Sequence, residues 1–268
     1  MPNRDRKTYT DANRAAWEAS AHLHGTGEDW EALLASASLP GFSTFDPCLT
    51  ATLQQIGLSG KRAVQIGCNN ARELLSLAAF GAEPALGIDQ SAAFLAQGAQ
   101  LAAAAGLAPL LLEADIYDLP AGDLGQHDLA LITIGVLNWM PDLPGFFRAV
   151  AGLMASGAHL VIYETHPFLE LFDPASETPH TPAFSYFTSA PQTVTEAIAY
   201  DGQDHGAGET GYWFIHTMGA ILTAMAGAGL RLETLTEHPH SNREPEYDLY
   251  EGRPAQIPMS YTLVARKA

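Results

Sequence analysis

Residues 63–73 read AVQIGCNNARE, a short apolar run that ends at Gly67 and continues into polar residues. The apolar residues at 63–66 are typical of a buried strand, and residues 71–80 (ARELLSLAAF) have helical spacing. A strand that hands over to a helix through a tight turn is the starting unit of an α/β sheet. This turn holds a single glycine, whereas a pyrophosphate needs close glycine backbone at a helix N-terminus, so a dinucleotide enzyme is disfavoured.

The same alternation of short apolar runs and longer helical segments continues along the chain. Parallel neighbouring strands need a crossover helix, so this rhythm predicts βα units around a mostly parallel sheet. The predicted strands are 85–88, 109–113, 128–134 and 159–163, and the predicted helices are 91–105 and 145–155.

Composition limits the partners of such a sheet. The 268 residues include 13 Lys plus Arg and 30 Asp plus Glu, which gives a net charge of -17. That charge repels phosphate backbones and anionic lipid, so neither nucleic acid nor a membrane is an expected partner. With two cysteines, Cys48 and Cys68, no apolar signal at the N-terminus and no apolar run long enough to span a bilayer, we expect a cytoplasmic protein.

Ligands of open α/β sheets bind at the carboxyl ends of the strands. The residues expected there are 67–70, Asp89, Asp115 and 135–138. Asp89 follows the second strand, and its distance from the first turn suits a carboxylate that accepts hydrogen bonds from two ribose hydroxyls. It could equally cap the helix that starts near Ser91. The joint occurrence of the turn, Asp89 and Asp115 favours a nucleoside site.

From about residue 10 to the C-terminus the chain resembles the class I S-adenosylmethionine-dependent methyltransferases. The matching segments are VQIGCNNARE (64–73), LGIDQS (86–91), EADIYDLP (113–120) and LITIGVLNWMPDLPGFFRAVAGLMASGAHLVIYETHP (131–167). Their order and spacing carry the match, because each motif alone is weak.

The resemblance implies a fold, a cofactor and a set of contacts. The expected fold is α/β, with a Rossmann-like, mostly parallel seven-stranded sheet whose last strand is antiparallel, and 230–236 and 259–265 fit the final hairpin. The expected cofactor is S-adenosyl-L-methionine. The residues expected to bind it are Asn13, Trp17, Gln65, Gly67, Cys68, Asn69, Asp89, Gln90, Asp115, Ile116, Ile134, Gly135 and Val136.

The first motif departs from the family pattern, which is an acid, then any residue, then GxGxG. Gln65 replaces the acid, and Asn69 and Ala71 replace the second and third glycines. Asn tolerates left-handed backbone angles better than most residues, so Asn69 is expected to preserve the turn. Of the other contacts, Ile116 is about equally suited to the core, and Asn13 and Trp17 could be purely structural.

Two segments lie outside the alternating pattern of a single domain that spans residues 1–268. Residues 8–24 predict an amphipathic cap helix with Trp17 on its apolar face. Residues 165–212 contain several prolines, and QTVTEAIAY (192–200) alternates like an exposed strand. Because a long structureless loop is improbable inside a compact domain, we expect this segment to be an insertion that covers the active site.

Two histidines are the candidates for catalysis. His166 follows the fifth predicted strand, and His216 lies near the start of a later helix, so both could hydrogen-bond a substrate or accept its proton. Each alone could equally be structural. Trp139, Tyr163 and Trp213 are the expected walls of the substrate site. No metal site is predicted, because the pairs His22 with His24 and His238 with His240 have no ligand-forming residues at convincing spacing.

The leading hypothesis is therefore a methyltransferase acting on a small-molecule O, N, S or C nucleophile. Two alternatives stay open, namely an enzyme of this fold that uses the cofactor differently and a noncatalytic cofactor-binding module. A covered site favours a small-molecule substrate over a protein or nucleic acid. A homodimer stays open as an assembly.

Overall fold

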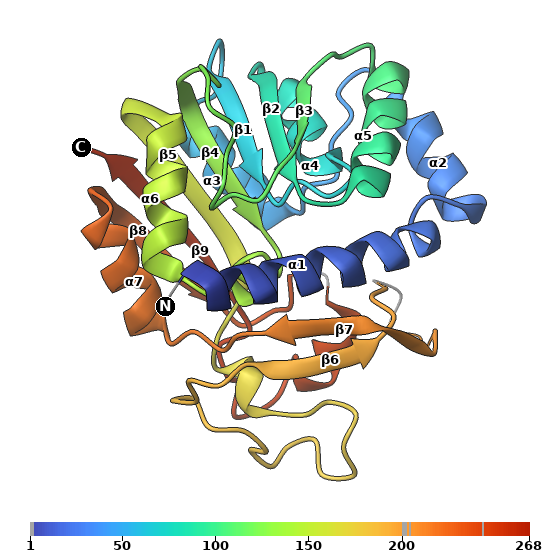
Figure 1. The fold of residues 1–268 in the computed structure, drawn as a ribbon, viewed down its shortest axis with the longest axis vertical. Coiled ribbons are helices and arrows are strands. Elements are labelled where there is room, and N and C mark those ends of the chain that lie inside the picture. Colours follow the sequence, from blue (N-terminus) through green and yellow to red (C-terminus); the bar gives the residue numbers. More distant parts are fainter. Residues whose placement is uncertain (1–2, 200–202, 204, 243) are drawn as a thin grey trace.

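The computed structural model describes residues 3–199, 203, 205–242 and 244–268. Its centre is a seven-stranded sheet in the order β3-β2-β1-β4-β5-β9-β8, in which only β9 runs antiparallel to its neighbours (Figure 1). The predicted α/β fold and its antiparallel last strand are confirmed. The strands are β1 (Arg62–Ile66), β2 (Glu83–Asp89), β3 (Leu110–Glu113), β4 (His127–Thr133), β5 (Met154–Thr165), β8 (Leu230–His238) and β9 (Ser260–Lys267).

The helices between these strands mostly begin at side-chain caps. Asp46, Ser91, Asp142 and Thr217 each accept a hydrogen bond from a backbone N–H of the first turn of α3, α5, α6 and α7 respectively. The helices are α1 (Asn3–Ser20), α2 (Gly27–Ala37), α3 (Pro47–Ile56), α4 (Arg72–Ser76), α5 (Ala92–Ala105), α6 (Leu143–Leu153) and α7 (Met218–Gly227), and the 3₁₀ helices are η1 (Ala21–Leu23), η2 (Leu77–Phe80), η3 (Leu137–Trp139), η4 (Leu169–Leu171) and η5 (Pro245–Tyr250).

Two predicted helices differ from the observed ones. The segment predicted as one helix over residues 71–80 is α4 followed by the 3₁₀ helix η2. The helix predicted to reach residue 155 ends at Leu153, because Met154 is already extended and pairs with His127 as the first residue of β5. Pairing with β4 therefore overrides helix propensity at this end.

The central strands bury both of their faces. Alternate residues point to opposite sides, so Leu160 and Ile162 of β5 pack in one apolar cluster, while Val161 and Tyr163 pack in another with Leu49 of α3. This two-sided burial explains why the strands read as continuous apolar runs.

The predicted insertion contains a second, two-stranded antiparallel sheet of β6 (Gln192–Glu196) and β7 (Ala207–Trp213). The strand expected within 192–200 is β6, whereas β7 was not anticipated. Residues 200–202 and 204 of the insertion lie outside the described residues. In Figure 1, α1 runs along the lower edge of the main sheet and separates it from β7.

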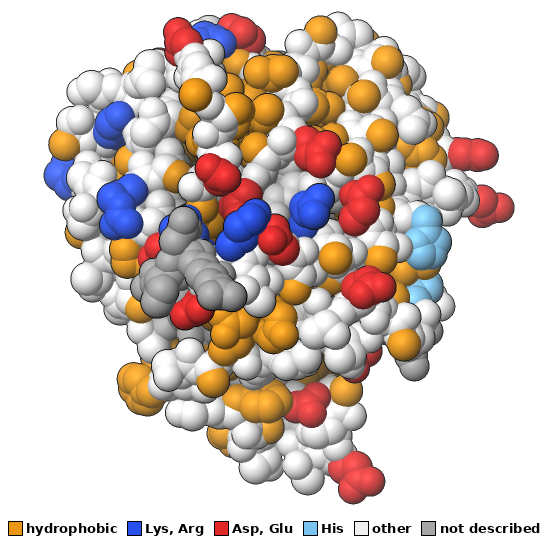
Figure 2. Space-filling view, viewed as in Figure 1, with side chains coloured by type: hydrophobic (Ala, Val, Ile, Leu, Met, Phe, Trp, Pro, Cys, Tyr) orange, Lys and Arg blue, Asp and Glu red, His pale blue; other side chains and the backbone are white. Residues whose placement is uncertain are grey.

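The surface carries charges of both signs. On the face shown in Figure 2, acidic side chains are scattered, and basic side chains lie among them. In the described part of the chain, no helix combines the length and apolar character needed to cross a bilayer.

Candidate functional site

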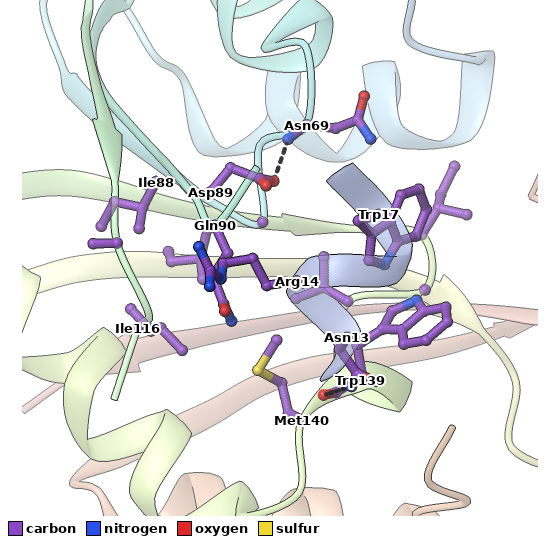
Figure 3. A pocket seen from close by; sticks show the side chains of 16 residues that line it. Asn13, Arg14, Trp17, Asn69, Ile88, Asp89, Gln90, Ile116, Trp139 and Met140 are labelled. Atoms are coloured by element: carbon purple, nitrogen blue, oxygen red, sulfur yellow. Dashed lines mark hydrogen bonds between the residues drawn. The ribbon is translucent and has the colours of Figure 1, made fainter. Parts of the chain in front are cut away.

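A cavity lies at the carboxyl ends of β1, β2 and β4, with residues of α1 forming one wall (Figure 3). It brings together most of the residues predicted to contact a cofactor, although they come from five separate segments of the chain. The predicted residues that line it are Asn13, Trp17, Gly67, Asn69, Asp89, Gln90, Ile116, Ile134, Gly135, Val136 and Trp139.

The turn after β1 keeps the shape of a glycine turn with fewer glycines. Gly67, Asn69 and Ala71 have φ angles of 64°, 50° and 59°. Asn69 thus adopts the left-handed conformation predicted for it, and Ala71 adopts it too, at a cost of about 1 kcal/mol. A Cβ at Gly67 would lie 2.7 Å from Val136 Cγ2, so a side chain at this position would collide with the loop after β4. Glycine is therefore retained where two loops meet.

Asp89 holds this turn in place. Its Oδ2 accepts from the Asn69 N–H at 2.7 Å, and its Oδ1 accepts from the Ser91 N–H at 2.9 Å. The N-cap of α5 is Ser91, whose hydroxyl accepts from the Phe94 N–H at 3.2 Å. Asp89 is therefore not the cap of α5, and its carboxylate still has lone pairs for a ligand. Burial raises the pKa of Asp89, and the backbone N–H groups oppose that shift.

The loop after β4 is strained and is held by a buried acid. Ile134 has a φ of 31°, which is unusual for a β-branched residue, and Gly135 follows at 85°. The carboxylate of Glu164, on neighbouring β5, accepts from the Gly135 N–H and, at 3.1 Å, from the Leu137 N–H. Burial raises the pKa of Glu164 to about 7. Glu164 thus positions the backbone that forms the floor of the cavity.

Helix α1 is attached to the sheet edge along its length. Thr10 Oγ1 donates to Asp115 Oδ2 at 2.8 Å, beyond β3. Near the C-terminal end of α1, Glu18 Oε2 accepts from Ser91 Oγ at 2.5 Å and from the Ala93 N–H at 3.1 Å, where α5 begins. The helix therefore crosses the cavity as a fixed wall.

Asn13 joins α1 to the two segments that flank it. Its Nδ2 donates to Trp139 O and to Tyr212 O, each at 3.1 Å, and its Oδ1 accepts from the Tyr212 N–H at 2.6 Å. Because the amide already makes these bonds, Asn13 acts in this structure as a connector between α1, β7 and η3. Asn13 lines the cavity, but its amide is engaged with these two segments.

A second cavity shares Gly67, Asn69 and Ile134 with the first. Its other lining residues are polar and come mainly from β1, α4 and the end of β4: Gln65, Arg72, Glu73, Thr133 and Glu244. Gln65 is 1% exposed, and its Nε2 donates to Thr133 Oγ1 at 3.1 Å, but its Oε1 has no hydrogen-bond partner among the described residues. A buried acceptor without a donor indicates a place for a ligand donor or water.

Three tryptophans form an aromatic cluster beside the first cavity. The Trp139 ring lies 5.5 Å from Trp17 and 5.1 Å from Trp213, edge to face in both pairs. A Cβ at Gly135 would lie 3.8 Å from Trp213 Cη2, so Trp213 reaches the loop after β4. Trp213 Nε1 donates to Glu170 Oε2 at 2.7 Å, and burial raises the pKa of Glu170 to about 7.

Several predicted contacts lie outside the first cavity. Cys68 is buried in the core, and its Sγ fills the space where Gly87 has no side chain. The Asp115 carboxylate accepts hydrogen bonds from the hydroxyl of Thr10 and, at 2.9 Å, from the N–H of Tyr117. Tyr163, expected as a substrate wall, instead lies on the opposite face of the sheet, where its hydroxyl donates to Asp46 Oδ2 at 2.5 Å. Strand alternation places it there, because its neighbour Ile162 faces the cavity side.

The two candidate catalytic histidines are also placed elsewhere. His166 Nδ1 accepts from the Phe168 N–H at 3.1 Å, so its Nε2 carries the proton and donates to Glu237 Oε1 at 2.9 Å. His216 Nε2 donates to Met140 O at 2.8 Å and lines a separate cavity with Phe187. Burial lowers the pKa of both imidazoles. Neither is among the described residues that line the two cavities at the β1 turn.

Sequence reasoning missed several residues of this region, among them Arg14, Glu164 and Glu170. Arg14 lines the first cavity next to Asn13 and is one turn from Trp17, so helical spacing could have indicated it. Glu164 interrupts an apolar strand, which is a signal of a buried acid with a specific partner. Glu170 lies in the short 3₁₀ helix η4 after β5, where no sequence pattern marks it.

Comparison with known proteins finds a matching family for part of the chain. Residues 64–162 match the family of methyltransferase domains. An S-adenosylmethionine-dependent methyltransferase from Mesorhizobium loti shares 20% identity over 81% of this chain and 96% of its own, with a TM-score of 0.54. The chain thus has the fold of the S-adenosylmethionine-dependent methyltransferases, and residues 64–162 carry the match to a methyltransferase domain.

Other solved structures share the fold of this methyltransferase. An S-adenosylmethionine-dependent methyltransferase from Clostridium acetobutylicum is 14% identical, covering 92% of this chain and 97% of its own, with a TM-score of 0.56. Geranyl diphosphate C-methyltransferase from Streptomyces coelicolor, solved with S-adenosyl-L-homocysteine, is 14% identical over 82% of this chain and 76% of its own, with a TM-score of 0.55. No curated protein matches this methyltransferase in sequence.

These solved structures are S-adenosylmethionine-dependent enzymes or hold S-adenosyl-L-homocysteine. The residues present in this chain fit S-adenosylmethionine: an acid with spare lone pairs, two glycines at positive φ in the loops after β1 and β4, and an unpartnered buried amide oxygen all lie in adjoining cavities.

Proposed function

We propose that this methyltransferase methylates a small-molecule nucleophile in the cavity between the carboxyl edge of the sheet and α1. The observation that supports this proposal best is the attachment of α1 along one side of that cavity, because Thr10, Asn13 and Glu18 bind α1 to segments after β3, β4 and β2. In this proposal the whole chain is one domain, residues 8–24 form the cap, and residues 165–212 form the lid.

The cofactor is assigned along the cavity by chemistry. Ile88 and Ile116 offer apolar faces to the adenine, and the Asp89 carboxylate accepts from the ribose hydroxyls. The methionine end is assigned to the second cavity, where the unpartnered Gln65 Oε1 can accept from an ammonium group. Asp115 has both oxygens engaged, so its predicted contact with the adenine amine would have to be shared with Thr10 or Tyr117.

The bound cofactor supplies an electrophilic methyl group on a sulfonium. Gly135 and the aromatic cluster of Trp17, Trp139 and Trp213 are proposed to define the path of the incoming nucleophile and to exclude water from it. Methyl transfer needs in-line geometry and a dry site more than acid or base groups, so positioning by these residues is proposed to supply most of the rate.

The proposed setting is a reducing compartment such as the cytoplasm, since both cysteines are free thiols. A net charge of -17 supports a small-molecule substrate over a nucleic acid.

The test incubates the protein with S-adenosylmethionine carrying a labelled methyl group and a metabolite extract. We expect a labelled product heavier by one methyl group and no such product with Asp89→Ala, whereas the exposed control Asp123→Ala should retain activity. Cofactor binding by calorimetry without any labelled product would indicate a binding module. Labelled products of another kind would indicate a different use of the cofactor, and either result would refute the proposed transfer.

A further inference from the structure

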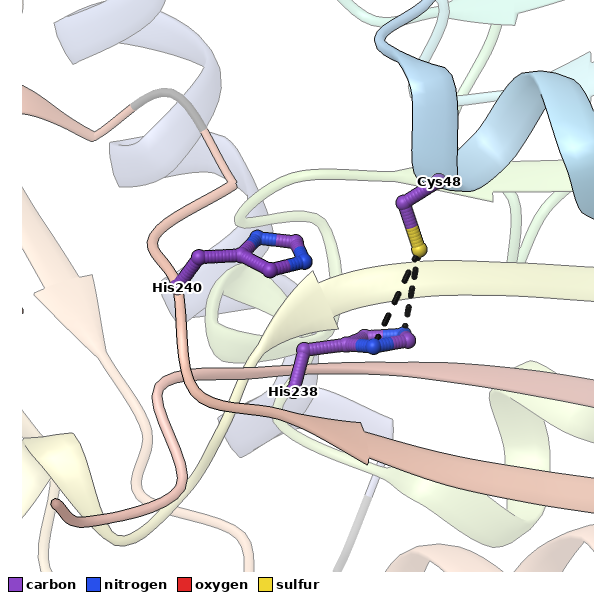
Figure 4. Close-up of side chains that lie close together, drawn as sticks. All are labelled: Cys48, His238 and His240. Carbon is purple, nitrogen blue, oxygen red and sulfur yellow. Dashed lines mark hydrogen bonds between the residues drawn. The ribbon is translucent and has the colours of Figure 1, made fainter.

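Three side chains of types that can bind metal ions lie close together at the end of β8, on the sheet edge that also carries the cofactor cavity. Cys48 is near the start of α3, His238 ends β8, and His240 follows two residues later (Figure 4). One ligand atom from each lies within 4.8 Å of the other two. Cys48 and His238 are 190 residues apart in sequence, so only the fold brings them together.

The geometry of this cluster fits a small tetrahedral site. Cys48 Sγ lies 3.2 Å from His238 Nε2. A tetrahedral ion with Zn–S near 2.3 Å and Zn–N near 2.1 Å would separate those atoms by about 3.6 Å. The rings of His238 and His240 stack with centroids 5.0 Å apart. The Cys48–His238 pair would therefore need a shift of about 0.4 Å, and the His240 donor, which lies within 4.8 Å of both, would have to approach by no more than roughly 1.4 Å, a movement that a small χ rotation supplies.

Neighbouring groups prepare the donors for a cation. His240 Nδ1 donates to Ser241 O at 3.0 Å, which leaves its Nε2 lone pair available. The Thr262 hydroxyl lies 2.9 Å from His238 Nε2 and 3.6 Å from Cys48 Sγ, so it can turn its hydrogen to a thiolate.

The nearby acid Asp46, the N-cap of α3, is engaged elsewhere, since its oxygens accept from the Leu49 N–H and the Tyr163 hydroxyl.

We propose that Cys48, His238 and His240 bind one Zn²⁺ ion, with water as the fourth ligand. A thiolate and two imidazoles are ligands that Zn²⁺ prefers, and water can enter through the adjoining cavity that Cys48 and His238 line. The ion would connect α3 to the start of the segment that carries Glu244 to the second cavity. Its role is thus to hold that segment against the sheet.

The test titrates metal-free protein without a histidine tag with Zn²⁺ in competition with a chromophoric chelator. The wild type is expected to bind one equivalent, and its Co²⁺ form should show a thiolate-to-metal charge-transfer band. Cys48→Ser should abolish the band. Cys48→Ser and His240→Ala should each weaken Zn²⁺ binding by about 100-fold or more, since losing a group that merely orients a metal ligand already costs roughly 10–100-fold.

Matched controls are Cys68→Ala, which removes the other thiol, and His22→Ala, which removes an exposed imidazole. Both should bind Zn²⁺ like the wild type. Melting curves of the metal-free variants identify any variant that fails to fold. If Cys48→Ser fails to fold, Zn²⁺ binding by His240→Ala decides the test. The absence of a bound equivalent in the wild type, or equal binding by wild type, Cys48→Ser and His240→Ala, would overturn the proposal.

Discussion

The cofactor cavity and the Cys48 cluster lie on one edge of one sheet but are assembled differently. The cavity takes most of its lining from loops that directly follow β1, β2, β3 and β4. The cluster joins α3 to the end of β8, which is level with the carboxyl end of β5, since His238 and Thr165 both pair with Ser260. Loops at strand ends can be predicted from the sequence, because the sheet edge at which they lie is known. A contact between segments that are distant in sequence cannot be predicted in this way.

The largest expected effect is that of Asp89→Ala on the cavity. The change removes the acceptor of the Asn69 and Ser91 N–H groups and the proposed contacts to two ribose hydroxyls. Charge-assisted bonds worth about 1.5–3 kcal/mol each predict a loss of cofactor affinity of roughly 100-fold or more. Calorimetry measures it, with Asp123→Ala as the control. Normal affinity in a variant that merely melts lower would reduce Asp89 to a structural role.

Asn13→Ala tests whether α1 is a fixed wall. Loss of the bonds to Trp139 and Tyr212 leaves three backbone groups without their partner, which should cost about 2–4 kcal/mol of stability and weaken cofactor binding about tenfold. Thermal unfolding and calorimetry on the same samples separate the two effects. Arg14→Ala, one residue further along α1, is the control, because Arg14 also lines the cavity but does not make the Asn13 hydrogen bonds to Trp139 and Tyr212. Equal losses of stability and cofactor affinity in both variants would show that the hydrogen bonds of Asn13 have no special role in holding α1.

Glu170→Gln should change how stability depends on pH. In the folded protein the pKa of Glu170 is about 7, against an ordinary 4.5, so between these values the folded state keeps a proton that the unfolded chain releases. Its contribution to stability therefore falls as pH rises from about 4.5 to 7. The variant should match the wild type near pH 4.5 and be more stable at pH 8 by up to about 3 kcal/mol, since each tenfold change in an acid constant corresponds to about 1.4 kcal/mol. Melting temperatures across this range check it, and a difference independent of pH would contradict it.

His166→Ala should have the smallest effect on the cavity. It breaks the bonds to Glu237 and to the Phe168 N–H, so we expect a loss of roughly 1–2 kcal/mol of stability with cofactor affinity unchanged. His216→Ala, which loses the bond to Met140 O, is expected to behave in the same way. If either variant turned over substrate slowly at normal cofactor affinity and stability, that histidine would reach the substrate after all.

Much of the fold could be predicted because its determinants are local. Apolar runs such as 63–66 and 159–163 are strands in the structure, and Asn69 has the left-handed angle that its residue type allows. Prediction failed where neighbours outside the segment decided the outcome. Met154 joined β5 because of its pairing with β4, and β7 contains glycines that lower strand propensity yet pairs with β6.

By itself, the sequence determined the order of strands and helices and which residues stand at the carboxyl ends of the strands, because these follow from periodicity and turn chemistry along the chain. Only the tertiary structure decided that Glu164 supports the loop at Gly135, that Tyr163 faces away from the cavity, and that Cys48 meets His238. The reason is physical. Side-chain direction alternates with each residue of a strand, and contacts across the sheet depend on register and packing that no short window of sequence contains.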